Sequence, residues 1–174
     1  LGDVYKRQAL AVSFALTWVL GGREENLHVT SPVQGELIPL AEVNDSTFLR
    51  GVLGPGVAIH PSKGKIVAPV DGTIEVTFET GHAVILSGRN GAEILVHVGI
   101  NTINLGGRYF SCKVKKGEKV KRGELLIEFQ KESIEREGYD LTTPVILVNA
   151  DKYDLTLIRE PGKVKMLDEV MQIE

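Results

Sequence analysis

From residue 27 onward the chain carries short apolar runs, many of which alternate with polar residues, and glycine, proline, asparagine or aspartate separates them. Alternation with period two is typical of strands with one buried face, and the separating residues favour turns. The spacing of these runs favours antiparallel strands over βαβ units. The pattern predicts an all-β fold, an antiparallel β-sandwich or barrel-like domain. The expected strands cover residues 35–40, 57–59, 65–67, 72–78, 82–86, 94–98, 113–114, 125–129 and 143–148.

Helical signals are sparse, so we expect only one or two short helices. Residues 132–137 predict one of them, and Gly138 is its stop signal. The last stretch, residues 153–174, is polar and weakly patterned, which predicts a weakly structured tail.

The beginning of the chain has a different character. Residues 9–20 form an uncharged apolar run after Lys6 and Arg7, and a run of this length is too short to span a bilayer, which takes ~20 residues. A signal peptide is one interpretation, but no small-residue cleavage site is evident. We interpret residues 1–22 as the end of a membrane helix whose start is missing. Residues 1–8 do not look like native sequence. Residues 23–30 then predict a linker, and residues 31–152 the folded domain.

Two stretches of the predicted domain resemble each other. Residues 31–37 and 68–74 share the pattern S/A-P-V-x-G-x-aliphatic, and residues 114–126 read V-x-x-G-x-x-V-x-x-G-x-L-L. Glycine turns on both sides of a buried valine predict a chain that wraps tightly at a corner. Several carrier folds share this architecture, so it does not select a function.

Charge and cysteine content narrow the functional classes. The net charge of −3 over 174 residues gives no reason to expect nucleic acid as a partner. The one cysteine, Cys112, excludes an internal disulfide framework and fits a reducing compartment. We interpret Cys112 as a small, half-buried residue.

A histidine pair is the strongest chemical signal. The apolar runs 83–86 and 94–98 flank a turn-rich Ser-Gly-Arg-Asn-Gly segment, and each run carries one histidine, His82 or His97. A two-residue turn at residues 89–90 would place the two side chains directly opposite each other, and one at 90–91 would make them diagonal neighbours on one face. A three-residue loop would place them on opposite faces. We expect the imidazoles to share one patch of sheet, and we interpret His28 and His60 as ordinary surface or turn residues.

Three kinds of chemistry suit such a pair. Zinc would require a third protein ligand, and no H-x-H, H-E-x-x-H or cysteine pair supplies one, so no metal or cofactor is expected. Acid–base catalysis through a serine lacks a G-x-S-x-G motif. A neutral imidazole can instead accept a phosphoryl group itself, while a second imidazole donates a hydrogen bond to the phosphoryl oxygens.

The residues around His97 carry a family resemblance. Gly91-Ala-Glu-Ile-Leu-Val-His97-Val-Gly-Ile-Asn-Thr102 closely resembles the phosphorylation-site motif of the glucose-type enzyme IIA domains of the bacterial sugar phosphotransferase system. Supporting matches follow in order: Gly56-Val-Ala-Ile59, Ala68-Pro-Val-Asp-Gly-Thr-Ile74, Phe78-Glu-Thr-Gly-His82-Ala, Gly117-x-x-Val-x-x-Gly123, Leu126-Ile-Glu-Phe129 and Thr143-Pro-Val145 with Asn149. Residues 39–45 and 138–144 look most like the version fused to β-glucoside-type permeases, whose order is IIB, membrane IIC, IIA.

The resemblance implies a phosphotransferase function. His97 would take phosphate from the phosphocarrier HPr and pass it to a IIB cysteine, which drives sugar uptake with phosphorylation. His82 would be its hydrogen-bonding partner and Thr80 would orient the rings. The domain would work at the cytoplasmic face of the bacterial membrane, with IIC in the same full-length chain. The implied docking face for HPr and IIB comprises Phe78, Val98, Ile100 and Asn101.

Two departures from the family pattern concern the site. Asn101 stands where the motif commonly has aspartate, which removes a charge that would face basic partners, and Gly81 beside His82 is also unusual. Cys112 lies outside any IIB-like motif, so the accepting cysteine belongs to other sequence. The choice of sugar belongs to the membrane part.

Two alternatives remain open. A biotinyl- or lipoyl-like carrier would need a lysine at a hairpin tip, for which Val164-Lys165-Met166 is the candidate. A regulatory binding domain that is never phosphorylated is the other.

Overall fold

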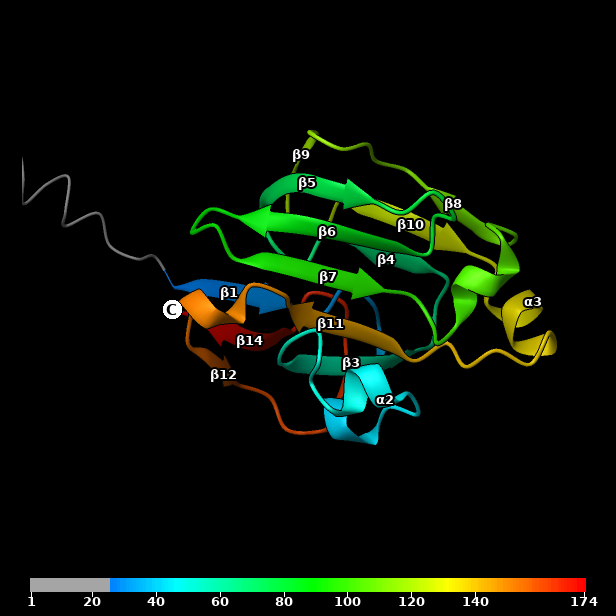
Figure 1. Ribbon diagram of the computed structural model, residues 1–174, viewed down its shortest axis with the longest axis horizontal. Coiled ribbons are helices and arrows are strands. Elements are labelled where there is room, and N and C mark those ends of the chain that lie inside the picture. The colour runs from blue at the N-terminus through cyan, green and yellow to red at the C-terminus, as the bar shows by residue number, and fades with distance from the viewer. Residues whose placement is uncertain (1–25) are drawn as a thin grey trace, which may run out of the picture.

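The structure is a computed structural model that describes residues 26–174. In this part of the chain, strands dominate and every strand pair is antiparallel (Figure 1). The strands are β1 (Leu27–Thr30), β2 (Gly35–Pro39), β3 (Gly56–Pro61), β4 (Lys65–Val67), β5 (Gly72–Thr77), β6 (Ala83–Gly88), β7 (Glu93–His97), β8 (Phe110–Cys112), β9 (Lys119–Val120), β10 (Leu125–Phe129), β11 (Thr143–Leu147), β12 (Leu155–Leu157), β13 (Gly162–Val164) and β14 (Glu169–Ile173). The helices are α2 (Ser46–Leu49) and α3 (Lys131–Arg136), with 3-10 turns η1 (Leu40–Glu42), η2 (Thr102–Leu105) and η3 (Ala150–Lys152). The expected all-β class with short helices is confirmed.

One large sheet organises the molecule. Its eight strands run in the order β13-β2-β3-β11-β7-β6-β5-β9, and two three-stranded sheets, β1-β14-β12 and β4-β10-β8, complete the fold. The main core lies between the inner face of the large sheet and the two small sheets, because alternate residues of each strand turn apolar side chains inward. Figure 1 shows β1, β14 and β12 at the end where the C-terminus lies and α3 at the opposite end.

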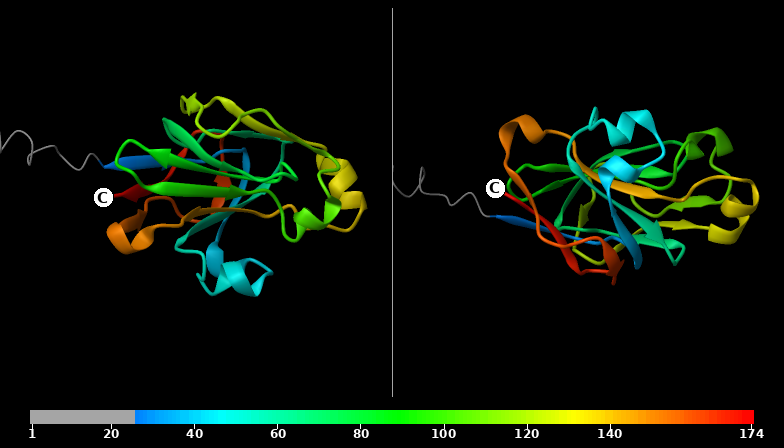
Figure 2. Two further views of the ribbon diagram at one scale, coloured as in Figure 1. Left: turned by 45° about the horizontal axis from the view of Figure 1, so that its top comes forward. Right: turned by 90° about the horizontal axis from the view of Figure 1, so that it is seen from below.

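A second, smaller cluster covers part of the outer face of the large sheet. Phe48 from α2 packs there with Ala58, Leu95 and Ile146, and Figure 2 shows α2 on the side of the sheet away from β8 and β10. Asp45 caps α2, since its carboxylate accepts hydrogen bonds from the Thr47 and Phe48 backbone N–H groups. The packing of Phe48 holds the helix against the face that also carries His97.

The two ends of the domain differ from the sequence-based expectation. Residues 27–30 form strand β1 instead of a linker. The expectation of a weakly structured tail over residues 153–174 is wrong, because this stretch forms β12, β13 and β14. β1 pairs with β14, and Val164, Val170, Met171 and Ile173 are buried. These strands are short and half polar, and two of them pair with strands near the other end of the described chain, β13 with β2 and β14 with β1. The local pattern alone therefore does not reveal them. The interpretation of residues 1–22 as the end of a membrane helix lies outside the described residues. Among residues 26–174, no helix has the length and apolar character needed to cross a membrane.

The repeated S/A-P-V-x-G segments occupy equivalent places in the structure. Gly35 pairs with Val164, and Gly72 pairs in the same way with Val120. Both glycines are needed for close backbone approach: a Cβ at Gly35 would lie 1.9 Å from the His60 carbonyl oxygen, and one at Gly72 would lie 2.0 Å from that of Ser87.

The backbone hydrogen bonds repeat as well. Ser31 N–H donates to Asp168 O and Leu167 N–H donates to Ser31 O. Ala68 makes the same two bonds with the turn that contains Gly123 and Glu124. The domain therefore contains the same arrangement of paired segments twice. The partner of residues 31–37 lies within the stretch 153–174, which was expected to be a tail.

Candidate functional site

The β6–β7 hairpin brings the two histidines together by an unexpected route. Ala83, and not His82, lies opposite His97, and the loop has three residues, 89–91, closed by a 2.9 Å hydrogen bond from Gly88 N–H to Ala92 O. In regular strands this register would place the two side chains on opposite faces. The ring centroids are nevertheless 4.7 Å apart at an interplanar angle of 82°, so the expected meeting of the imidazoles is confirmed.

Gly81 explains why the alternation of faces does not apply. Its φ of +71° lies in the left-handed region, which glycine enters readily. The bend takes His82 out of β6, which begins at Ala83, so the imidazole of His82 turns toward His97 at the end of the sheet.

The hydrogen bonds of His97 define its chemistry. Its Nδ1 lies 2.8 Å from the carbonyl oxygen of Gly99. Because a carbonyl oxygen only accepts, Nδ1 carries the proton and the lone pair of the neutral ring is on Nε2. Gly99 has a φ of +83°, and a Cβ there would lie 2.4 Å from Thr102 Cγ2, so only glycine fits. Burial lowers the pKa of His97, and the hydrogen bond to Gly99 and the charge of Asp45 oppose that shift.

His82 is the more deeply buried ring, with 1% of its surface exposed. Its Nδ1 lies 2.5 Å from Thr80 Oγ1. Burial, reinforced by His97, lowers the pKa of His82 from 6.5 to about 4. His82 is therefore neutral at pH 7, and Thr80 holds its ring at Nδ1.

Aromatic rings enclose the pair. Phe48 lies 5.2 Å from His97 and Phe78 lies 5.5 Å from His82, measured between ring centroids. Phe110 contacts His82 from a further side at 6.4 Å. Such apolar surroundings disfavour the charged form of both rings, which preserves the nucleophilic lone pair.

His97 opens onto a shallow hollow of about 660 Å³, lined by Asp45, Thr47, Phe48, Val52, Leu53, Phe78, Ile85, Leu95, His97, Asn101, Ile103 and Val148. Val52 and Ile103 on its rim are 69% and 55% exposed. Exposed apolar side chains gathered around a polar group are typical of a protein–protein contact surface.

The residues that the sequence indicated for docking fall into two groups. Phe78 and Asn101 line the hollow. Ile100 is buried at 6% exposure and Val98 at 0%, and Val98 belongs to the main core, so Val98 presents no surface to a partner. Asn101 has a φ of 57°, a conformation that asparagine tolerates better than most residues.

The sequence reasoning missed the α2 side of the hollow. Asp45, Phe48 and Val52 reach His97 only because α2 folds over the outer face of the sheet. The one local signal was the Asp-Ser-Thr-Phe start of the helix, since aspartate is a preferred N-cap.

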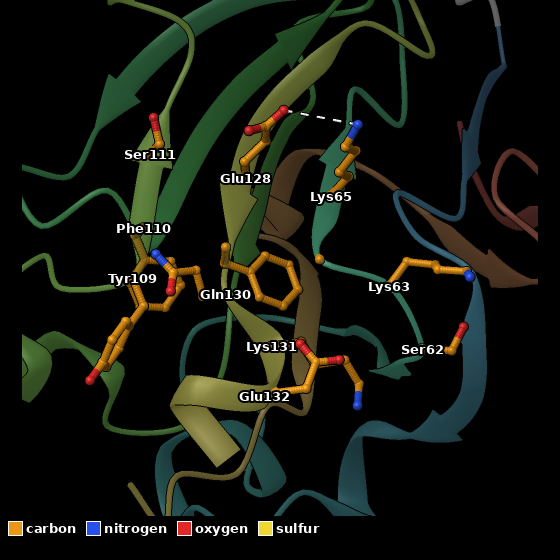
Figure 3. A pocket seen from close by; sticks show the side chains of 12 residues that line it. Ser62, Lys63, Lys65, Tyr109, Phe110, Ser111, Glu128, Gln130, Lys131 and Glu132 are labelled. Atoms are coloured by element: carbon orange, nitrogen blue, oxygen red, sulfur yellow. Dashed lines mark ion pairs between the residues drawn. The ribbon is translucent and has the colours of Figure 1, made fainter. Parts of the chain in front are cut away.

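A second hollow lies behind Phe110 and contains no histidine (Figure 3). Phe110 and Phe129 form its apolar part, with ring centroids 6.2 Å apart. Lys65 and Glu128 form an ion pair of 4.0 Å on its rim. Phe110 thus separates this hollow from His82.

Lys165, the attachment site that the carrier alternative required, lies between β13 and β14. These strands belong to different sheets, so Lys165 is not at the tip of a hairpin of paired strands. Among the described residues, no group of three or more histidine, cysteine, aspartate or glutamate side chains is arranged to hold a metal ion.

Comparison with known proteins identifies the family. A family model described as "phosphoenolpyruvate-dependent sugar phosphotransferase system, EIIA 1" matches residues 27–153. The chain is 50% identical over 131 residues to the PTS system beta-glucoside-specific EIIBCA component of Dickeya chrysanthemi, covering 75% of this chain and 20% of that protein. It is 39% identical over 144 residues to the PTS system glucose-specific EIIA component of Oceanobacillus iheyensis, covering 83% of this chain and 84% of that protein.

A solved structure agrees with these matches. Glucose permease IIA from Mycoplasma capricolum superposes with a TM-score of 0.78 at 35% sequence identity, covering 85% of this chain and 96% of that one. The fused β-glucoside-type relatives are much longer proteins, of which this chain spans between a fifth and a quarter.

Proposed function

Because the chain belongs to the EIIA 1 family of the phosphoenolpyruvate-dependent sugar phosphotransferase system, we propose that it carries a phosphoryl group on His97 between two protein partners. The donor is the phosphohistidine of HPr and the acceptor is the cysteine of a IIB domain. The observation that carries the proposal is the 2.8 Å hydrogen bond from His97 Nδ1 to Gly99 O, which leaves Nε2 free at the mouth of the hollow.

The transfer needs only groups that the two proteins supply. The lone pair of His97 Nε2 attacks phosphorus, a new N–P bond forms, and the N–P bond of the donor breaks with its electron pair returning to the donor imidazole. His82, held at Nδ1 by Thr80, donates from Nε2–H to a phosphoryl oxygen, where a fixed hydrogen bond stabilises the developing charge. Transfer to the IIB cysteine reverses the roles, with a thiolate as nucleophile.

The docking surface in this proposal is the hollow around His97. Phe48, Phe78, Val52, Ile103 and Asn101 form it, and Val98 is left out because it is buried. A shallow apolar surface without a deep anchor pocket suits a transient complex, since the protein must release both partners.

The fused relatives support a wider assignment. The names of three of them contain EIIBCA and specify β-glucosides. We therefore propose that this domain works with a IIB domain and a membrane IIC domain of one β-glucoside-type permease, at the cytoplasmic face of the bacterial membrane, where its phosphoryl group drives sugar uptake with phosphorylation.

Phosphorylation in a reconstituted system tests the proposal. The purified chain is incubated with phosphoenolpyruvate, enzyme I and HPr, and we expect one acid-labile, base-stable phosphate on His97. His97→Ala should abolish the label and His82→Ala should slow its appearance. His28→Ala, at a half-buried position in β1, serves as the control. An unlabelled wild-type protein would support the purely regulatory alternative. A label that survives in His97→Ala and disappears in His82→Ala would reverse the two roles.

A further inference from the structure

A hydrogen-bond chain of three residues lies beside the site. His60 is at the end of β3 and Thr142 directly precedes β11. Thr142 Oγ1 lies 2.7 Å from His60 Nδ1 and 2.6 Å from Asp140 Oδ1. A carboxylate only accepts, so the Thr142 hydroxyl donates to Asp140 and must accept from His60 Nδ1–H. The direction of every bond in the chain is therefore defined, and Thr142, 1% exposed, is its buried centre.

Asp140 connects this chain to the loop after His97. Its carboxylate also accepts from Thr142 N–H at 2.8 Å, which closes an Asx turn and fixes the local backbone. Its own carbonyl oxygen accepts from Ile100 N–H at 2.8 Å, and a Cβ at Gly99 would lie only 3.0 Å from the same oxygen. The Asp140 backbone is thus packed against Gly99, whose carbonyl oxygen accepts the hydrogen bond from His97 Nδ1–H.

The orientation of the Gly99 carbonyl matters for reactivity. The tautomer of an imidazole is set by the hydrogen bond that its other nitrogen makes. If the peptide between Gly99 and Ile100 rotates, His97 loses the acceptor that keeps the proton on Nδ1, and Nε2 becomes protonated in part of the molecules. His97 itself bonds the carbonyl side of that peptide, and the bond from Ile100 N–H to Asp140 O fixes its N–H side from outside β7.

We propose that Thr142, together with Asp140 and His60, is a positioning residue that holds the Gly99–Ile100 peptide and thereby keeps His97 in its nucleophilic tautomer. The proposal rests on the proposed phosphoryl transfer at His97. The charged groups near His60 on the neighbouring strands are Glu36, directly opposite it on β2, and Asp140 itself.

The variant Thr142→Val tests the proposal, because it removes the hydroxyl and keeps the volume. Thr30→Val is the matched control, since Thr30 is an equally buried threonine whose hydroxyl donates to Pro69 O at 3.0 Å, far from the site. Thr142→Ser should restore the wild-type behaviour. His60→Ala, at an exposed position, tests the outer end of the chain with His28→Ala as its control.

Two measurements separate positioning from general stability. Nitrogen-15 NMR of the histidine rings in the 174-residue chain reports the tautomer of His97 without any partner protein. We expect Thr142→Val to lower the population with the proton on Nδ1, and Thr30→Val to leave it unchanged. With phospho-HPr, we expect the transfer rate at saturating donor to fall roughly tenfold, with an unchanged half-saturating concentration, because the geometry of attack is impaired and docking is not.

Equal tautomer populations and equal transfer rates in Thr142→Val and Thr30→Val would overturn the positioning role. If the wild-type chain accepts no phosphate, the proposed function fails, and the NMR measurement still decides the inference about Thr142. If the wild type is phosphorylated and only Thr142→Val shows the altered tautomer, both stand.

Discussion

The pH dependence of stability gives a direct measure of how deeply His82 is buried. Burial lowers its pKa from 6.5 to about 4, so between these pH values the unfolded chain binds a proton that the folded chain does not. Linkage then requires the free energy of unfolding to fall as the pH drops through this window. The loss begins near pH 6.5 and ends near pH 4, below which both states are protonated.

The magnitude follows from the two pKa values. One unit of pKa difference corresponds to about 1.4 kcal/mol, so the full loss attributable to His82 is about 3 kcal/mol. At pH 5 the loss is already about 2 kcal/mol relative to pH 7. For a domain whose total stability is of order 5–15 kcal/mol, a change of this size is readily measured.

Urea denaturation of the wild type and of His82→Gln at pH 7 and pH 5 tests the reasoning. Glutamine keeps a polar side chain of similar reach but does not titrate, so the other titrating groups act in both proteins and cancel. The wild type should lose about 2 kcal/mol more than the variant between the two pH values. Parallel losses in the two proteins would show that the pKa of His82 is not depressed and that the ring is hydrated.

Three further predictions concern other positions. Gly35→Ala should lower the free energy of unfolding by more than about 3 kcal/mol or prevent folding, because its Cβ meets the His60 carbonyl oxygen. Gly117 has a φ of +91° and open space around it, so Gly117→Ala should cost only about 1 kcal/mol by urea denaturation. Asn101→Asp should speed association with phospho-HPr at low salt and lose that advantage at high salt in stopped-flow measurements, since an added charge at the rim acts on the on-rate. Phe48→Ala should cost about 3–4 kcal/mol in thermal or urea unfolding because it leaves a cavity in the outer cluster, and a cost below 1 kcal/mol would mean that α2 is not packed on the sheet.

The local sequence pattern was sufficient to predict a strand or helix where the apolar run is well delimited or where the helix has its own stop signal. The expected strands at 65–67 and 125–129 coincide with β4 and β10, and the helix expected at 132–137 overlaps α3 with Gly138 in the left-handed region. The strand expected at 113–114 was misplaced, since β8 covers Phe110–Cys112. Its pairing with Phe129, Glu128 and Ile127 decides that position, and such a partner is invisible in a three-residue window.

The sequence by itself indicated which side chains are candidates for the proposed chemistry and which glycines the backbone requires, because those properties belong to single residues and their neighbours. It could not decide how distant segments meet. His82 and His97 face each other only because the bend at Gly81 removes His82 from the alternation of β6. Strand β1 finds its partner, β14, at the opposite end of the described chain. The same holds for His60, which looks like an ordinary turn residue in the sequence, whereas in the fold its Nδ1–H donates a hydrogen bond to Thr142 Oγ1, 82 positions later. The direction of a hydrogen bond and the direction in which a side chain points depend on the residues that surround it, and only the tertiary fold brings those residues together.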